Sequence, residues 1–579
     1  MEYLKIYENL VIERPNEIAI EAYGEKITYL ELDLKSSGAA MDIQKELIDK
    51  ESVVAICSNG TIENFIAILG CIKSGIPFIN LDVTAPKEYI DLLCRQLSIK
   101  LYLYSEGYQD AVSNEIPKKN IKKLNYTKQS EYSCKISELN YFVATSGTTG
   151  IPKIVKKTEK SLINSFNQMK MAVPMIFNTT VQQYATLSFA FGLDQTLIML
   201  IGGTKICVDK KSEYINLEEL YLNIEKNRAK VVFLAASIIK LLSKQPDLFE
   251  KIPSCLKYIV VGGEPLVVSA DFIFELRNRK IKLLNNYGCT ETGTVFFSLM
   301  EIQLLEIEQY NKVAIGKPLP SFLAVILNEQ LLETNKGELY IGMDKFTNSY
   351  LDISIHEKLY FLKKYPEKVF YKMGDIAEKL KGKYYIIGRN DNCVNVKGYR
   401  VEIENVENII SQIIKGNECC VVPIENNYKE INLVCYYCYD LIDEKDLKKR
   451  LYEYLPNYMI PVSFIKTKKL VHSKNGKLDR KEMKLKYEEY LQGSNLLVNE
   501  SEMKVRLKNL VENMLSIKLS EDCYSLTFQE IGLDSLGVTD YICTVEKQEN
   551  IKIEDTALSE VRFDSIDTLV KYIRGKKNE

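Results

Sequence analysis

The alternation of short apolar runs with amphipathic stretches is the feature that most limits how this chain folds. Through about residue 330, runs typical of strands alternate with stretches of helical periodicity; examples are VVAIC (53–57), TIENFIAILGCIKSG (61–75), KVVFLAAS (230–237) and LKYIVVGG (256–263). Strands and helices that alternate on this scale build a layered architecture. An α/β fold is therefore predicted for this part of the chain.

The pattern changes in the rest of the chain. With 579 residues the chain is too long for one core, so about two to four domains are expected. The sequence becomes strand-rich from about residue 337, and a smaller α+β pattern runs from about 392 to 488. Polar and small residues at 487–503 then lead into a stretch with helical periodicity. The last 80 or so residues are expected to form a separate small helical bundle.

Composition argues against several classes of function. The net charge is −2 and 27% of the residues are charged, so nucleic acid is not expected as a partner. No segment approaches the roughly 18 apolar residues of a membrane span, and no signal peptide is evident, so a cytoplasmic protein without a membrane partner is expected. The two histidines, His356 and His472, make a Ser-His-Asp or Cys-His catalytic unit improbable. The 14 cysteines are scattered and are expected to be reduced thiols.

Hydroxyl side chains and glycines crowd the stretch TSGTTGIPK (145–153), which lies between two apolar, strand-like runs. Glycine lets backbone amides approach a ligand closely, and the hydroxyls and a lysine add donors and charge, so the loop suits a polyanion such as triphosphate. A hydrophilic hairpin is the alternative from these residues alone. The loop is not a Walker P-loop, because no Gly-Lys-Ser/Thr follows at the required spacing.

Eight motifs occur in one order along the chain. They are FINLDVTAP (78–86), TSGTTGIPK (145–153), NNYGCTET (285–292), GELYIG (337–342), YKMGDIAE (371–378), GRNDNCVNVKGYRVE (388–402), LPNYMIP (455–461) and NGKLDR (475–480). The series resembles the adenylate-forming enzymes, specifically a nonribosomal peptide synthetase adenylation domain followed by a carrier (thiolation) domain. The resemblance implies an adenylation core at 1–390, a small mobile α+β C-terminal subdomain at 391–488, a linker at 489–500 and an all-α four-helix carrier domain at 501–579.

The resemblance implies a site for ATP and Mg²⁺. Tyr287 would lie against the adenine, Asp375 and Arg389 would bind the ribose, and Glu291 would bind Mg²⁺, a hard cation that prefers oxygen ligands. The residues implied in holding the phosphates or flanking them are Thr145, Ser146, Gly147, Thr148, Thr149, Gly150, Lys153 and Thr290.

Two further residues are implied in catalysis of the first half-reaction. Lys477 would touch both the attacking carboxylate and the α-phosphate, which lowers the barrier by positioning and by offsetting charge. Asp391 lies where such enzymes hinge, and rotation there would withdraw Lys477 after adenylation.

The stretch FQEIGLDSLGVTDYI (528–542) resembles the signature of a carrier protein, in which a serine carries 4'-phosphopantetheine. That serine is Ser535, and Asp534 is expected to mark the start of a helix. From the residues alone, Ser535 reads as a helix cap. The resemblance implies a phosphopantetheinyl transferase and downstream biosynthetic enzymes as partners.

The residues that would bind the acid depart from the family's pattern for α-amino acids. An ungapped alignment of ATLSFAFGLDQTLIMLIGGTKICV (185–208) places Ala190 where those members have an aspartate that binds the substrate ammonium. A buried ammonium without a carboxylate is unfavourable, so an aryl, hydroxy or fatty acid is one hypothesis, and a β- or ω-amino acid held by Asp194 is another. An ordinary α-amino acid bound by Asp194 after a local shift stays open. The predicted acid pocket consists of Phe189, Ala190, Phe191, Asp194, Phe233, Val260, Gly262, Asn286, Thr294 and Val295.

The implied reaction joins ATP and a small carboxylic acid to give an acyl adenylate and pyrophosphate, followed by transfer of the acyl group to the thiol on Ser535. No paired-histidine motif of a condensation domain is found, so a loading or stand-alone unit of natural-product biosynthesis is expected. The alternatives are an acyl- or aryl-CoA ligase with a helical appendage and a degenerate nucleotide-binding scaffold.

Overall fold

The computed structural model describes most of the chain. The residues that it does not describe are 48–51, 59, 114, 125–138, 146–151, 210–216, 244, 264–265, 267, 269, 300–312, 345–347, 351–357, 390–392, 397–398, 416, 426–430, 440–441, 468, 472–479, 494–501, 516, 550–552, 554–563 and 579. The described residues form two compact units, one up to residue 389 and one from residue 393. No helix in the described part has the length and apolar character of a membrane span, and the described cysteines are free thiols.

Two mainly parallel sheets form the body of the first unit. Seven strands make one sheet, in the order β17 (Ser349–Tyr350), β8 (Lys153–Thr158), β7 (Asn140–Thr145), β4 (Phe78–Asn80), β3 (Val53–Cys57), β5 (Ile99–Tyr104), β6 (Lys118–Asn120). Eight strands make the other, in the order β14 (Gly293–Leu299), β13 (Lys282–Cys289), β12 (Tyr258–Gly262), β11 (Val231–Ala235), β9 (Thr180–Gln183), β10 (Lys205–Val208), β1 (Ile18–Ala22), β2 (Glu25–Thr28). Every residue of β3 is buried, as is typical of a parallel strand covered on both faces.

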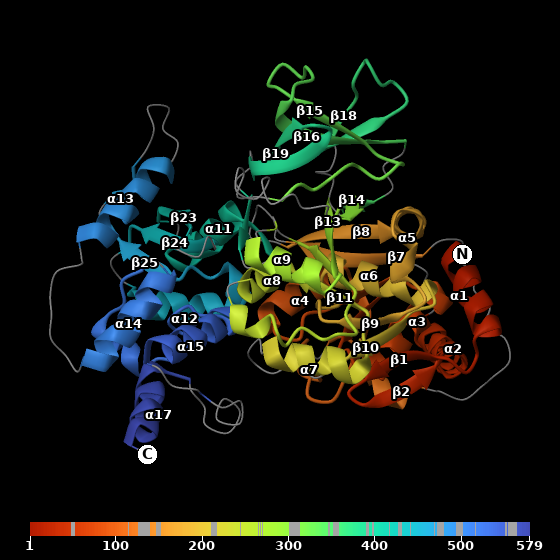
Figure 1. The fold of residues 1–579 in the computed structure, drawn as a ribbon, viewed down its shortest axis with the longest axis horizontal. Coiled ribbons are helices and arrows are strands. Elements are labelled where there is room, and N and C mark those ends of the chain that lie inside the picture. The colour runs from red at the N-terminus through yellow and green to blue at the C-terminus, as the bar shows by residue number, and fades with distance from the viewer. Residues whose placement is uncertain are drawn as a thin grey trace. The chain divides into compact units, whose positions relative to one another are not determined.

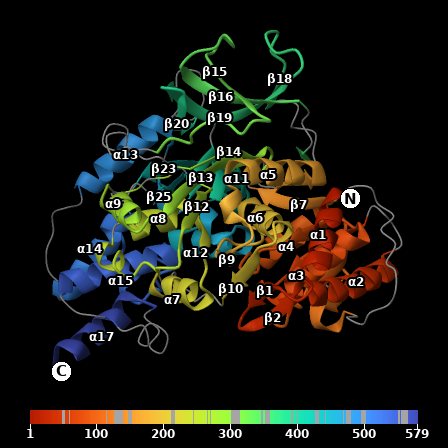
Figure 2. The same cartoon turned by 45° about the vertical axis from the view of Figure 1, so that its right-hand side comes forward.

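Helices cover and separate these sheets. Those described in the unit are α1 (Glu2–Glu13), α2 (Tyr29–Glu46), α3 (Ile62–Ser74), α4 (Lys87–Gln96), α5 (Glu159–Ala172), α6 (Ala190–Ile201), α7 (Leu217–Asn227), α8 (Ala236–Leu242) and α9 (Ala270–Asn278). Helices α1 and α2 pack together near the N-terminus (Figure 1). Helix α3 is buried along its length and contacts β3 of one sheet and β1 and β2 of the other (Figure 2). The predicted layered α/β architecture is confirmed.

A five-stranded sheet completes the first unit. Its strands are β15 (Leu323–Leu327), β16 (Lys336–Met343), β19 (Val369–Leu380), β18 (Leu359–Tyr360) and β20 (Lys383–Arg389), which pairs with β19. Strands β19 and β20 form a hairpin whose turn contains Lys381 and Gly382, with φ angles of 48° and 78°. This left-handed turn sets the register of the two strands next to it, and a shift of the register between Ile376 and Ala377 then brings Asp375 opposite Arg389.

The second unit combines a smaller α/β segment with helices at its C-terminal end. Strands β23 (Cys419–Glu425), β24 (Ile431–Tyr437) and β25 (Ser463–Lys466) form a sheet, β21 (Cys393–Val396) pairs with β22 (Tyr399–Glu402), and the helices of this segment are α11 (Ile403–Ile413), α12 (Glu444–Tyr454) and α13 (Arg480–Gly493). The α-helices described after them are α14 (Glu502–Leu515), α15 (Ser535–Glu549) and α17 (Ile566–Asn578), coloured blue in Figure 1. The expected fourth helix and the expected domain boundaries stay predictions.

Candidate active site

Asp375 is held between two partners that come from different parts of the sequence. The register of β19 and β20 places it directly opposite Arg389, and the Arg389 Nη1 atom lies 2.7 Å from Asp375 Oδ1. The hydroxyl of Tyr287, on β13, donates to Asp375 Oδ2 at 2.6 Å. Burial, followed by the Asp375 carboxylate, raises the pKa of Tyr287 well above its usual range, so the phenol stays a donor. The structure thus brings together the three residues predicted to contact adenine and ribose.

A tight turn between β13 and β14 carries Thr290 and Glu291. A Cβ atom on Gly288 would lie 1.9 Å from the carbonyl oxygen of Gly293, so glycine is required there. Gly293 itself has a φ of 71°, which favours glycine too. The Thr292 hydroxyl closes the turn by accepting from the backbone N–H of Cys289 at 3.3 Å. This turn fixes the backbone around the carboxylate predicted to bind Mg²⁺.

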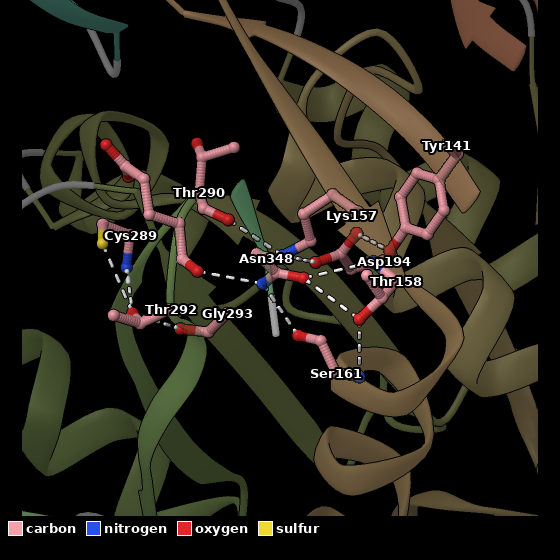
Figure 3. Close-up of polar contacts among 11 residues, drawn as sticks. Tyr141, Lys157, Thr158, Ser161, Asp194, Cys289, Thr290, Thr292, Gly293 and Asn348 are labelled. Atoms are coloured by element: carbon pink, nitrogen blue, oxygen red, sulfur yellow. Dashed lines mark hydrogen bonds and ion pairs between the residues drawn. The ribbon is translucent and has the colours of Figure 1, made fainter. Parts of the chain in front are cut away.

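Asn348 fastens this turn to helix α5, and sequence reasoning missed it. Its side-chain nitrogen donates to the carbonyl oxygen of Glu291 at 2.9 Å and to Ser161 Oγ at 3.0 Å (Figure 3). Its side-chain oxygen accepts from the backbone N–H of Thr158, at the start of α5, at 3.1 Å. Asn348 is 4% exposed, so its amide is satisfied by protein groups. A lone asparagine gives no signal of this role in a single sequence.

A buried ion pair lies next to the same turn. The Lys157 Nζ atom, on β8, lies 3.0 Å from Asp194 Oδ2, on α6, and donates to the carbonyl oxygen of Thr290 at 2.9 Å (Figure 3). The Tyr141 hydroxyl, on β7, donates to Asp194 Oδ1 at 2.6 Å. Burial, followed by Asp194, raises the pKa of Tyr141 well above its usual range. Lys157 was not among the predicted site residues, because a lysine in a strand is usually exposed.

Several residues of the predicted acid pocket lie on neighbouring strands. Phe233 of β11 is opposite Val260 of β12, and Gly262 of β12 is opposite Asn286 of β13. The Phe191 ring lies at 6.2 Å from the Phe233 ring, edge to face, and a Cβ atom on Gly262 would lie 2.8 Å from the Phe191 ring. The absence of a side chain at Gly262 therefore makes room for Phe191.

The remaining residues of the predicted acid pocket lie at the start of α6 and on β14. Phe189 precedes α6, and Ala190 begins that helix and packs on the same apolar cluster as Phe191. Thr294 and Val295 both belong to β14, but Val295 is fully buried in a different cluster, with residues of the five-stranded sheet. The packing of Val295 gives no support to its place in the pocket.

The predicted phosphate loop joins two paired strands. Thr145, the last residue of β7, is directly opposite Lys153, the first residue of β8, and its hydroxyl donates to the Lys153 carbonyl oxygen at 3.3 Å. The expectation that this loop connects two strands is confirmed. Ser146, Gly147, Thr148, Thr149 and Gly150 lie outside the described residues, as do Asp391 and Lys477.

Helix α15 begins at Ser535, and Asp534 caps it. The Asp534 Oδ1 atom accepts from the backbone N–H of Gly537 at 2.8 Å, which is the contact of an N-cap residue. The expectation that Asp534 marks the helix start is confirmed. Ser535 is the first residue of the helix, so the cap that Ser535 alone suggested is supplied by Asp534.

Comparison with known proteins shows the family of the chain. The model of the AMP-binding enzyme family matches residues 8–351, more than half of the chain. The chain therefore belongs to the AMP-binding enzymes, which are adenylate-forming and use ATP and Mg²⁺. The Tyr287, Asp375 and Glu291 groups fit such ligands, because carboxylates accept from ribose hydroxyls and bind Mg²⁺.

The relatives include nonribosomal peptide synthetases. Gramicidin S synthase 2 of Brevibacillus brevis is 28% identical over 99% of this chain, which spans 13% of the length of that protein. A solved NRPS protein containing adenylation and PCP domains, bound to a vinylsulfonamide inhibitor, has a TM-score of 0.81 and 19% identity, covering 99% of this chain and 96% of that chain. The o-succinylbenzoate CoA synthetase of Bacillus subtilis has a TM-score of 0.71 and 17% identity, covering 83% and 98%. These likenesses support the α/β adenylate-forming fold.

Proposed function

We propose that this enzyme activates a small carboxylic acid with ATP and transfers the acyl group to a phosphopantetheine thiol on its own Ser535. The observation that carries the first half of the proposal is the Asp375 carboxylate, fixed between Tyr287 and Arg389. A fixed carboxylate accepts hydrogen bonds from ribose hydroxyls without reorganising. The turn that follows β13 carries Glu291, which would bind Mg²⁺.

In the first half-reaction the acid carboxylate attacks the α-phosphate of ATP and pyrophosphate leaves. The loop at 145–153 would hold the β- and γ-phosphates through backbone amides, hydroxyls and Lys153. Lys477 would contact both reacting groups, whose negative charges repel each other. Rotation at Asp391 would then remove Lys477 and open the site for transfer.

In the second half-reaction the acyl group passes to the thiol that phosphopantetheine supplies. The helices after residue 501 would form the carrier domain, and Ser535, at the first position of α15, would be modified by a phosphopantetheinyl transferase. The Asp534 cap supports this reading, because it fixes the start of the helix at Ser535. Downstream biosynthetic enzymes would receive the acyl group.

The proposed substrate lacks the usual α-amine. Ala190 stands at the start of α6, where it offers no carboxylate to an α-ammonium. Aryl, hydroxy and fatty acids, and β- or ω-amino acids, meet this condition. Exchange of labelled pyrophosphate into ATP tests the reaction: it should require one of these acids, and exchange with an α-amino acid would reject the interpretation of Ala190.

The carrier assignment predicts a specific mass change. After incubation with CoA and a phosphopantetheinyl transferase, the intact mass should rise by one phosphopantetheine arm, because the Ser535 hydroxyl accepts it. Ser535→Ala should abolish the rise, and the nearby Ser525→Ala should not. A rise that survives Ser535→Ala would contradict the assignment, and acyl transfer to free CoA by a protein that stays unmodified would favour a CoA ligase.

The Asn348 contact predicts an altered requirement for Mg²⁺. Asn348→Ala removes the donor that fixes the Glu291 backbone, so the Mg²⁺ concentration for half-maximal exchange should rise by roughly tenfold, as for losses of groups that orient a metal ligand. Asn164→Ala is a matched control, because this amide of α5 donates to Ser321 at 3.2 Å. A lower melting temperature with an unchanged Mg²⁺ requirement would show that Asn348 acts only on stability.

A further inference from the structure

Three elements place polar side chains at one point beside the predicted acid pocket. Tyr141 of β7 and Lys157 of β8 are direct cross-strand partners, so both side chains emerge on the same face of the sheet. Asp194 lies on α6 and meets both of them (Figure 3). Asp194 follows Ala190 by four positions along α6, so the two lie on the same face of the helix. The cluster therefore adjoins the position where an α-amine would be bound.

The contacts occupy both oxygens of the Asp194 carboxylate. Lys157 Nζ lies 3.0 Å from Oδ2 and the Tyr141 hydroxyl donates to Oδ1 at 2.6 Å. The Lys157 side chain is 1% exposed and that of Asp194 is 13% exposed, so water screens their attraction little. The Thr290 carbonyl oxygen gives Lys157 a second acceptor at 2.9 Å. The lysine is thus fixed in place, and its charge cancels that of Asp194.

Binding of a substrate ammonium next to this cluster would be unfavourable. The ammonium could displace Lys157 from Asp194, or it could bind while Lys157 stays in place. In the second case two cations would share one carboxylate. Displacement would leave the Lys157 cation buried without its carboxylate, which is strongly unfavourable. The Phe191 and Phe233 rings add apolar surface at the same pocket. This surface suits an uncharged substrate.

We propose that Lys157 is a specificity-determining residue that neutralises Asp194, so that the enzyme selects an acid with no charge other than its reacting carboxylate. This inference rests on the proposed function and narrows it. Of the acids proposed above, the aryl, hydroxy and fatty acids with no charge besides the reacting carboxylate remain as substrates, and the β- and ω-amino acids are excluded. Asp194 then serves as the partner of Lys157 instead of binding an amine.

Pyrophosphate exchange with matched acids tests the inference. Each set contains an acid whose side chain is uncharged, the derivative that carries an amine and the derivative that carries a second carboxylate. One set consists of hexanoate, its ω-amino form and the matching dicarboxylate. An aryl set starts from benzoate, and a hydroxy set starts from a hydroxyalkanoate. In each set that supports exchange, the wild-type enzyme should prefer the uncharged member over both charged ones by about tenfold or more, because the neutral Lys157–Asp194 pair offers no counter-ion to a second charge that is buried with the substrate.

Charge-changing variants should move this preference in opposite directions. Lys157→Met leaves the Asp194 carboxylate uncompensated and should shift the ratio toward the amine by about tenfold, whereas Asp194→Asn leaves the cation and should shift the ratio toward the dicarboxylate. The double variant, Lys157→Met with Asp194→Asn, has neither charge and should again prefer the uncharged acid. If Lys157→Met does not fold, Asp194→Asn and the double variant still decide the result.

The outcomes separate this inference from the proposed function. Exchange by the wild-type enzyme that favours the amine-bearing member, or ratios unchanged in Asp194→Asn, would overturn the role of Lys157 while leaving acid activation intact. A lack of exchange with every set, together with no thermal stabilisation by the acyl-sulfamoyl adenosines of the same acids, would overturn the proposed function and this inference with it.

Discussion

Replacing Lys477 with alanine is expected to lower the rate of adenylate formation by about a hundred- to a thousandfold, the loss typical of removing one group that stabilises charge in a transition state. The reacting carboxylate and the α-phosphate are both anionic, so a cation in contact with both lowers the barrier by position and by charge. Transfer from an acyl adenylate supplied from outside should change by less than about threefold, because the proposed rotation at Asp391 would have withdrawn Lys477 before that step.

The two half-reactions can be measured separately. Pyrophosphate exchange reports adenylation, and acylation of the modified protein by synthetic acyl adenylate reports transfer. Lys474→Ala is the matched control, since it removes a nearby lysine that lies outside the NGKLDR motif. Equal losses in both steps would contradict the proposed movement at Asp391. A loss as large in Lys474→Ala would show that the charge of the segment matters more than the position of one lysine.

The positions of strands along the chain were the part of the fold most accessible from sequence. Apolar runs such as residues 53–57 and 231–235 became buried parallel strands, because β-branched residues without alternation favour strands covered on both faces. The loop at 145–153 was predicted to join two strands, and β7 and β8 confirm it. Sheet order was not accessible, since strands that pair, such as β1 and β10, are far apart in the chain.

The candidate site was accessible where a motif marks it. Tyr287, Asp375 and Arg389 come from three motifs, and the structure joins them through hydrogen bonds and an ion pair. Their proximity follows partly from the β19–β20 hairpin, in which the glycine-containing turn and a register shift between Ile376 and Ala377 together place Asp375 opposite Arg389. The roles of these residues toward ATP stay predictions, as do those of Asp391 and Lys477.

The buried polar contacts could not be predicted from one sequence. Lys157 stands in the run KIVKK, where lysines look like the exposed side of an edge strand, yet its side chain is 1% exposed. Its burial depends on Asp194, which a different element supplies. From the sequence alone, Asp194 is a possible ligand of an amine, because nothing near it in the chain shows that a lysine pairs with it. A tertiary partner of this kind leaves no local pattern.

Asp375→Ala should raise the KM for ATP by about a hundredfold, since hydrogen bonds to a charged group are worth about 1.5–3 kcal/mol each and a tenfold change corresponds to about 1.4 kcal/mol. The variant also takes from Arg389 the carboxylate that lies 2.7 Å away. Lys372→Ala is a matched control, because Lys372 forms a 3.1 Å ion pair with Glu338 within the same sheet. That variant should leave the KM for ATP within about twofold, as expected for a partly exposed pair.

A cycle that combines this variant with altered nucleotides identifies what Asp375 binds. With the wild-type enzyme, an ATP analogue that lacks both ribose hydroxyls should bind about a hundredfold more weakly than ATP, because the buried carboxylate loses the hydrogen bonds that the ribose would donate. With Asp375→Ala, removal of the hydroxyls should cost little more, since both changes delete the same contacts. If the two fold-losses in nucleotide affinity multiply, Asp375 does not bind the ribose and acts elsewhere, for example by orienting Tyr287 against the adenine. Other residues would then bind the ribose. If the loss of binding in Asp375→Ala and the loss on removing the ribose hydroxyls are not additive, Asp375 binds the ribose. If they are additive in free energy, the Tyr287–Asp375–Arg389 group acts on the adenine instead.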